Sequence, residues 1–265
     1  MAVYLFEHSW DQERRRLDVL EQVFDAASRD CLGRVPVPPG GRCLEVGAGA
    51  GSIARWLCAR VGPAGRVVAT DLDTGFLETL TEENLEVRRH DVVADELETE
   101  AFDLVHARLV VEHLPQRDRV LRRLVAALRP GGWLVLEDFD WTSLVPARAC
   151  TGGDLLARSV EALALVFSAA GVAIDYGRSL PLDFRAAGLV DVAAEGRVHV
   201  GLGGTPAATW WQLSLAKLGR PMIGTGLITE AELDELLRTC DDPGFCFLFP
   251  TLVTAWGRRT GPGRE

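Results

Sequence analysis

The sequence predicts an α/β domain in which helices cover both faces of a doubly wound, mostly parallel sheet. Between residues 42 and 140, short apolar runs such as "RCLEV", "RVVAT" and "WLVLEDF" alternate with helix-like stretches such as "SIARWLCARV" and "RDRVLRRLVAALRP". These runs are apolar throughout, as expected for strands that are buried on both faces. A chain of 265 residues is long enough for one such core with additions.

Helical additions flank this alternating segment. Residues 11 to 31 place Leu17, Leu20 and Phe24 at helical spacing, and "VPVPPGG" ends that helix. After "WLVLEDF", residues 146 to 170 look helical, and "SLPLDFRAAGLVDVAAEGRVHV" predicts a helix followed by a strand. Two more helices are expected in "PAATWWQLSLAKLG" and "TEAELDELLRT", the second with a capping box of Thr229 and Glu232, before a last strand in "FCFLFPTLVTAWGRR".

We therefore predict four segments: an N-terminal helical cap (1–41), a ligand-binding core (42–145), a helical cap insertion after the fifth strand (146–187), and the rest of the core (188–265) with a helical insertion near 205–220. An insertion at this place is a natural substrate cap, because function concentrates in loops that a rigid sheet positions.

Composition narrows the function classes. A formal net charge of −10 disfavours nucleic acid or an anionic membrane as a partner. We find neither a long apolar run nor a signal-peptide pattern, so we expect a cytoplasmic location. The six cysteines show no CxxC spacing, which favours reduced thiols over disulfides or a zinc site. The run Arg14 to Arg16 is expected on a solvated helix face.

Three glycines, Gly47, Gly49 and Gly51, follow the first predicted strand in "CLEVGAGAGSIARWL". The loop after this strand borders the ligand crevice of a doubly wound sheet, and glycine lets the backbone approach a ligand closely. A dinucleotide fingerprint requires a sixth-position glycine where Ser52 stands, and the chain has no Walker A pattern. The spacing disfavours NAD, FAD and nucleoside triphosphates; a tight turn with nothing bound remains an alternative.

Two acidic residues end the next predicted strands. Asp71 is suited to accept hydrogen bonds from both hydroxyls of a ribose, although it is also placed to cap a following helix, a role for which Asp73 is better placed. Asp91 ends the third strand, where it is placed to accept a hydrogen bond from an adenine amino group. Together with the glycine turn, these residues favour a nucleoside ligand.

The motifs "LEVGAGAG", "VVATDLD", "RHD", "FDLVHARLVVEHLP" and "LRPGGWLVLEDFD", in this order, resemble the class I S-adenosylmethionine-dependent methyltransferases over residues 42 to 140. The whole chain is similar to bacterial small-molecule methyltransferases. The resemblance implies a Rossmann-like seven-stranded sheet with an antiparallel last strand. It also implies S-adenosylmethionine as the cofactor, S-adenosylhomocysteine as the product, and transfer to oxygen, nitrogen or carbon of a small molecule in secondary metabolism.

The resemblance also implies roles for single residues. The methionine part of the cofactor would contact Glu45 and the turn of Gly47, Ala48, Gly49 and Gly51, with Ala107 near the sulfonium. The ribose would contact Asp71, and the adenine would contact Leu72, Asp91 and the backbone of Val92.

A general base is needed only if the acceptor carries a proton at the working pH. His113 and His106 are the candidates; we favour His113, with a structural role for either as the alternative. Arg108 and Glu112 are expected to pair one helical turn apart. We expect no metal, although Asp138 and Asp140 leave a divalent ion open.

Aromatic residues in the predicted cap suit a flat, aromatic acceptor, although one of the adjacent tryptophans is expected in the core. The candidate substrate-lining residues are Tyr4, Phe6, His8, Trp10, Arg108, Trp141, Tyr176, Trp210 and Trp211.

Two other functions stay open. The protein could bind the cofactor without transferring a methyl group, as a cyclase or ligand sensor would, because a fold does not prove a function. A nicotinamide oxidoreductase is disfavoured by Ser52. A homodimer is also left open, since residues 11–31 and 146–170 suit either a cap or a dimer surface.

Overall fold

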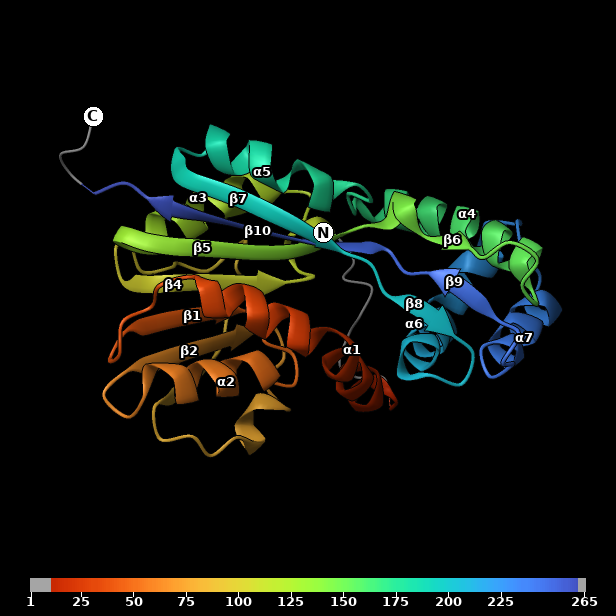
Figure 1. Ribbon diagram of the computed structural model, residues 1–265, viewed down its shortest axis with the longest axis horizontal. Helices are drawn as coiled ribbons and strands as arrows, with labels where there is room; N and C mark the ends of the chain where they lie inside the picture. The colour runs from red at the N-terminus through yellow and green to blue at the C-terminus, as the bar shows by residue number, and fades with distance from the viewer. Residues whose placement is uncertain (1–10, 262–265) are drawn as a thin grey trace.

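The computed structural model describes residues 11–261, which form a seven-stranded sheet with a helical lobe beside it (Figure 1). The strands are β1 (Arg42–Val46), β2 (Arg66–Asp71), β3 (Leu85–Arg89), β4 (Phe102–Arg108), β5 (Leu128–Asp140), β7 (Leu189–Arg197) and β10 (Thr251–Arg259). Their order is β3-β2-β1-β4-β5-β10-β7. The strands from β3 to β5 pair in parallel, whereas β10 is antiparallel to both β5 and β7. The predicted fold class is confirmed.

Helices cover both faces of this sheet. One face packs against α1 (Glu13–Arg34) and α2 (Ser52–Val61), and the other packs against α3 (Arg117–Ala127) and α5 (Tyr176–Ala186). Along β1, Cys43 belongs to the first of these cores and Leu44 to the second, as expected when successive strand residues point to opposite faces.

The lobe contains α4 (Gly153–Ala170), α6 (Pro206–Gly224) and α7 (Glu230–Thr239), with a small sheet of order β6-β9-β8. The strands of that sheet are β6 (Val145–Pro146), β8 (Val200–Leu202) and β9 (Cys246–Leu248). Helix α1 reaches from the large sheet toward this lobe (Figure 1). There the Phe24 ring lies 5.5 Å from Phe139 and 6.0 Å from Trp210, centroid to centroid. The aromatic core of the lobe therefore includes α1 and the end of β5.

Three local predictions differ from the structure. The single last strand predicted in "FCFLFPTLVTAWGRR" is two strands, β9 and β10, which belong to different sheets and are interrupted at Pro250, a residue without a backbone donor. The helix-like stretch "GFLETL" forms only the 3-10 turn η1 (Leu77–Thr79). The helix expected from residue 146 begins at Gly153. The division of the chain at residues 41, 145 and 187 stays a prediction.

Within residues 11–261, no helix combines the length and the hydropathy that crossing a membrane requires.

The capping box of α7 is confirmed and gives a stability prediction. The Thr229 hydroxyl accepts a hydrogen bond from the Glu232 amide at 3.3 Å, and the Thr229 amide donates to the Glu232 carboxylate at 2.8 Å. We expect Thr229→Ala to lower the free energy of unfolding by about 1 kcal/mol, because one helix amide loses its acceptor. Thr229→Ser keeps that acceptor and should stay close to wild type. Urea denaturation measures both variants, and equal midpoints for Ala and Ser would contradict the prediction.

Candidate functional site

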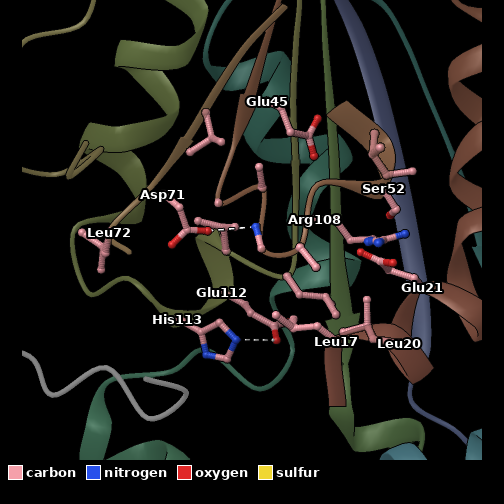
Figure 2. A pocket seen from close by; sticks show the side chains of 18 of the residues that line it. Leu17, Leu20, Glu21, Glu45, Ser52, Asp71, Leu72, Arg108, Glu112 and His113 are labelled. Carbon is pink, nitrogen blue, oxygen red and sulfur yellow. Dashed lines mark hydrogen bonds and ion pairs between the residues drawn. The ribbon is translucent and has the colours of Figure 1, made fainter. Parts of the chain in front are cut away.

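A cavity lies at the carboxyl ends of β1, β2 and β4, between the sheet, α1 and the lobe (Figure 2). This is the edge at which doubly wound sheets bind ligands. Its wall at the strand ends includes Glu45, Gly47, Ala48, Gly49, Asp71, Leu72, Asp91 and Val92; the rest includes Leu17, Leu20 and Glu21 of α1, Arg108, Leu109, Glu112 and His113 after β4, and Phe139, Trp141 and Trp210.

The glycine turn adopts backbone angles that favour glycine. Gly47, Gly49 and Gly51 have φ values of +65°, +57° and +89°. A Cβ on Gly47 would lie 2.4 Å from Val110 Cγ2, so the turn packs closely against the loop after β4. Gly51 is outside the cavity wall: a Cβ there would meet Leu80 Cδ1 at 2.5 Å. The first two glycines therefore shape the cavity, and the third lets the segment after β2 pack.

Asp71 ties the glycine turn to the end of β2. Its carboxylate accepts a hydrogen bond from the Gly49 amide at 2.9 Å and another from the Asp73 amide at 3.3 Å. Asp73 accepts from the Gly75 amide at 2.9 Å, which closes a turn, so the expectation that it caps a helix is wrong. Asp91 lines the cavity and accepts from the Val93 amide at 2.8 Å.

His113 lies beside the buried acid Glu112, at the opposite side of the cavity from Glu45 (Figure 2). Its Nε2 is 3.4 Å from Glu112 Oε1, in the 3-10 turn η2 (Val111–His113). The Glu112 carboxylate also accepts from the Phe139 amide at 2.7 Å and from the Trp141 indole at 3.2 Å. Burial raises the pKa of Glu112, and burial together with the charge of Glu112 raises that of Asp138. Burial and the charge of Arg16 lower the pKa of His113 to about 4, so its imidazole is neutral at pH 7.

His106 lies behind the cavity wall. It is fully buried between Glu45 and Glu137, with its ring nitrogens 2.7 Å and 2.9 Å from their carboxylate oxygens. It does not line the cavity, so the structure places it as a buried hydrogen-bonding group and does not bring it to a reacting atom.

Arg108 pairs with α1. Its guanidinium donates to Asp25 at 3.0 Å and to the Ser28 hydroxyl at 2.9 Å, and the Ser52 hydroxyl donates to Asp25 at 3.0 Å. The expected pair of Arg108 with Glu112 is therefore wrong, because Arg108 ends β4 and does not share a helix with Glu112, whose carboxylate has other partners. In Figure 2, Arg108, Glu21 and Ser52 share one side of the cavity.

Helix α1 contributes more to the cavity than the sequence indicated. Glu13, Arg16, Leu17, Leu20 and Glu21 all line it. The prediction of a solvated arginine run is wrong for Arg16, which is buried and lies 2.6 Å from Glu13. The i, i+3, i+4 spacing of these five residues was the available signal, because it places them on one helix face.

Of the remaining predicted site residues, two line the cavity, three lie in the protein core, and four lie outside the described residues. Trp141 and Trp210 reach the cavity, with stacked rings 6.5 Å apart. Trp211 packs against Phe247 in the lobe core, Ala107 and Tyr176 lie in the core under α3 and α5, and none of these three lines the cavity. Tyr4, Phe6, His8 and Trp10 lie outside the described residues.

The described part of the chain, residues 11–261, contains no group of three or more His, Cys, Asp or Glu residues arranged to hold a metal ion. The two acids that left this option open have other partners: Asp138 lies beside Glu112, and Asp140 pairs with Arg178 at 2.7 Å.

Comparison with known proteins identifies the core. Residues 44–134 match the family model described as a methyltransferase domain. This segment is therefore similar to methyltransferase domains. The predicted resemblance to class I S-adenosylmethionine-dependent methyltransferases is confirmed by this match together with the fold.

Three similar proteins illustrate the match. Methyltransferase str2 of Strobilurus tenacellus is 36% identical over 101 residues, which cover 38% of this chain and 36% of the relative. The ubiquinone/menaquinone biosynthesis C-methyltransferase UbiE of Bordetella parapertussis is 32% identical over 115 residues, which cover 41% of this chain and 45% of the relative. The structure of Haemonchus contortus phosphoethanolamine N-methyltransferase 2 with S-adenosyl-L-methionine aligns with a TM-score of 0.52 at 16% identity, covering 94% of this chain and 52% of that one. The chain thus matches less than half the length of these two curated relatives.

The contact between Gly47 and Val110 predicts a stability difference between two glycine substitutions. Alanine at Gly47 or at Gly226 (φ +77°) costs about 1–2 kcal/mol for a left-handed backbone angle. Space is open around Gly226, whereas a Cβ on Gly47 meets Val110. We therefore expect Gly47→Ala to lower the free energy of unfolding further than Gly226→Ala in urea denaturation. Equal losses would show that Val110 moves aside at no cost.

Proposed function

We propose that this protein is a methyltransferase that moves a methyl group from S-adenosylmethionine to a small-molecule acceptor. The observation that carries the proposal is the position of the glycine turn and Asp71 of the methyltransferase domain, which together form one wall of a cavity at the strand ends. The acceptor atom is oxygen, nitrogen or carbon, and the biological setting we propose is bacterial secondary metabolism.

The residues present suit this cofactor. Gly47 and Gly49 have no side chains, so a ligand can approach the backbone of this part of the cavity wall closely. Glu45 and Asp71, beside them, supply carboxylates. Glu45 and the turn would hold the methionine end, and Asp71 would accept hydrogen bonds from the ribose hydroxyls. Leu72, Asp91 and Val92 would contact the adenine. Carboxylates on this wall are compatible with a cationic sulfonium and unfavourable for a pyrophosphate.

Part of the cavity lining suits an apolar, flat acceptor. Leu20, Phe139, Trp141 and Trp210 contribute aliphatic and aromatic surface to the cavity. The cofactor, when bound, supplies a methyl group that is already activated. The protein then has to align the acceptor with that group and exclude water, which a cavity closed by α1 and the lobe favours.

His113 is the base we propose for an acceptor that must lose a proton. It is neutral at pH 7 because its pKa lies near 4, so it has a lone pair available for that proton. Its Nε2 lies 3.4 Å from the carboxyl of Glu112, whose own pKa is raised by burial.

The cofactor assignment predicts a binding loss in Asp71→Asn. This change keeps the size of the side chain and an acceptor for Gly49, but removes one of the two oxygens available to a ribose. We expect S-adenosylmethionine and S-adenosylhomocysteine to bind the wild type and to lose at least tenfold in affinity, about 1.4 kcal/mol, in calorimetric titration. Asp73→Asn, on an exposed turn residue, is the matched control. Binding of NADH alone, or of none of these ligands, would refute the proposal.

Catalysis by His113 predicts a loss of turnover with retained cofactor affinity. We expect His113→Gln to lower kcat by about 10²-fold or more with an acceptor that carries a proton, found by screening phenols, amines and acids for S-adenosylhomocysteine release. His199→Gln is the control, since His199 lies outside the cavity wall. Because the His113 pKa is near 4, kcat/KM should not fall between pH 8 and pH 6 through this residue.

If S-adenosylhomocysteine and methylated product form in equal amounts, the protein transfers a methyl group. If the acceptor is converted without release of S-adenosylhomocysteine, the alternative function, in which the cofactor is bound but donates no methyl group, is favoured. A His113→Gln enzyme with full turnover would exclude His113 as the base.

A further inference from the structure

Three neighbouring strands place an acid, a histidine and an acid in one row on the sheet face that α1 covers. Glu45 on β1 and His106 on β4 are register partners in a parallel pair, and Glu137 lies on β5, the next strand. His106 Nδ1 is 2.7 Å from Glu45 Oε2, and His106 Nε2 is 2.9 Å from Glu137 Oε1. All three side chains are at least 96% buried.

This geometry requires an extra proton. A neutral imidazole carries one N–H, and an ionised carboxylate has only acceptors. Both ring nitrogens are at hydrogen-bonding distance from a carboxylate oxygen, so a neutral ring between two ionised acids would leave one contact with lone pairs on both sides. That contact would be repulsive in a site from which water is excluded. When the ring is an imidazolium, each of its two N–H groups donates a hydrogen bond to one carboxylate.

The two ends of the row lead to different parts of the molecule. Glu45 lines the cavity beside the glycine turn. Glu137 accepts hydrogen bonds from the Ser28 hydroxyl of α1 at 3.0 Å and from the Thr254 hydroxyl of β10 at 3.1 Å. Ser28 in turn accepts from Arg108 at 2.9 Å. A continuous set of buried contacts therefore joins the cavity wall to the helix that closes the cavity.

We propose that His106 is a positioning residue: held as an imidazolium between Glu45 and Glu137, it fixes the Glu45 carboxylate at the cavity wall and couples ligand binding there to the seating of α1. The extra proton in the row stands on the contacts, its place on the ring stands on the charges described next, and the ligand-binding consequence rests on the proposed function. His106 touches no acceptor and takes no proton from one.

The surrounding charges agree with an imidazolium. Burial acts to lower the pKa of His106, but Glu45 and Glu137 outweigh it and raise the pKa to about 9. Arg108 at the end of β4 also acts to lower the pKa of Glu137, and the charge of Glu137 reaches Cys31 of α1 and Asp138 of β5. Because the folded pKa lies above the usual value of about 6.5, the proton stabilises the folded protein below pH 6.5. That stabilisation is lost as pH rises through about 9.

The first test is nuclear magnetic resonance of wild-type protein with ¹⁵N-labelled histidine, titrated from pH 5 to pH 10. The chain has five histidines, and His106→Gln assigns the signal of interest by its absence. We expect one imidazole with both nitrogens protonated at pH 8, where a histidine with an ordinary pKa is neutral. A His106 ring that is neutral at pH 7 would overturn the proposal, whatever the variant does.

The second test measures the affinity for S-adenosylhomocysteine against pH. We expect the wild-type Kd to be constant from pH 6 to pH 8 and to rise severalfold, to about tenfold at most, by pH 10, with no such rise in His106→Gln, which binds weakly throughout. His199→Gln, which removes a histidine that packs on the Phe24 ring of α1, should keep the wild-type profile. A wild-type Kd that stays constant to pH 10, or a His106→Gln profile that matches wild type, would contradict the positioning role.

Ser28→Ala tests the coupling to α1, because it removes the contacts of Ser28 with Glu137 and with Arg108 and leaves His106 and Glu45 in place. We expect severalfold weaker binding with the pH dependence retained; unchanged binding would contradict the coupling. If wild type binds no S-adenosylhomocysteine at any pH, the proposed function fails, and the histidine spectra still decide the state of His106.

Discussion

The packing of α1 across the junction between the sheet and the lobe is the interaction on which the cavity depends. Phe24 is fully buried, and its ring lies within 6.0 Å of the Phe139, Trp210 and Phe249 rings, centroid to centroid. These three rings come from β5, from α6 and from the chain between β9 and β10. Edge-to-face aromatic contacts of this kind favour one orientation of the helix. The same helix then presents Leu17, Leu20 and Glu21 to the cavity.

A helix seated this way buries polar groups, and each of them has a partner. Asp25 is held by Arg108 and Ser52, and Ser28 by Glu137 and Arg108. Removing one member of such a buried pair destabilises the fold by more than the pair's net contribution to stability, because the other member stays buried without a partner. The position of α1 is thereby specified by polar contacts as well as by aromatic packing, at the place where a cofactor and its acceptor would meet.

The two histidine candidates illustrate how environment assigns a role. His106, behind the cavity wall, lies between two carboxylates, which favour its charged form, whereas burial and the charge of Arg16 favour the neutral form of His113. The opposite pKa shifts of these two histidines separate a structural charge from a candidate proton acceptor.

The sequence by itself determined the strands of the sheet, the glycine turn and the acids at the strand ends, and the family resemblance added the antiparallel last strand. The first three features are local, because strand periodicity, a backbone angle that favours glycine and a carboxylate at a strand end all act within a few residues. For the same reason the capping box at Thr229 was predictable and is present.

Only the tertiary structure decided which side chains share the cavity. Trp210 and Trp211 are neighbours in the sequence, yet one lines the cavity and the other packs in the lobe core. Arg108 pairs with Asp25, 83 residues away, instead of with the nearby Glu112. Contacts of this kind depend on how α1 docks across strands that are distant along the chain. That docking is set by the combined shape and charge of several elements, which no local pattern contains.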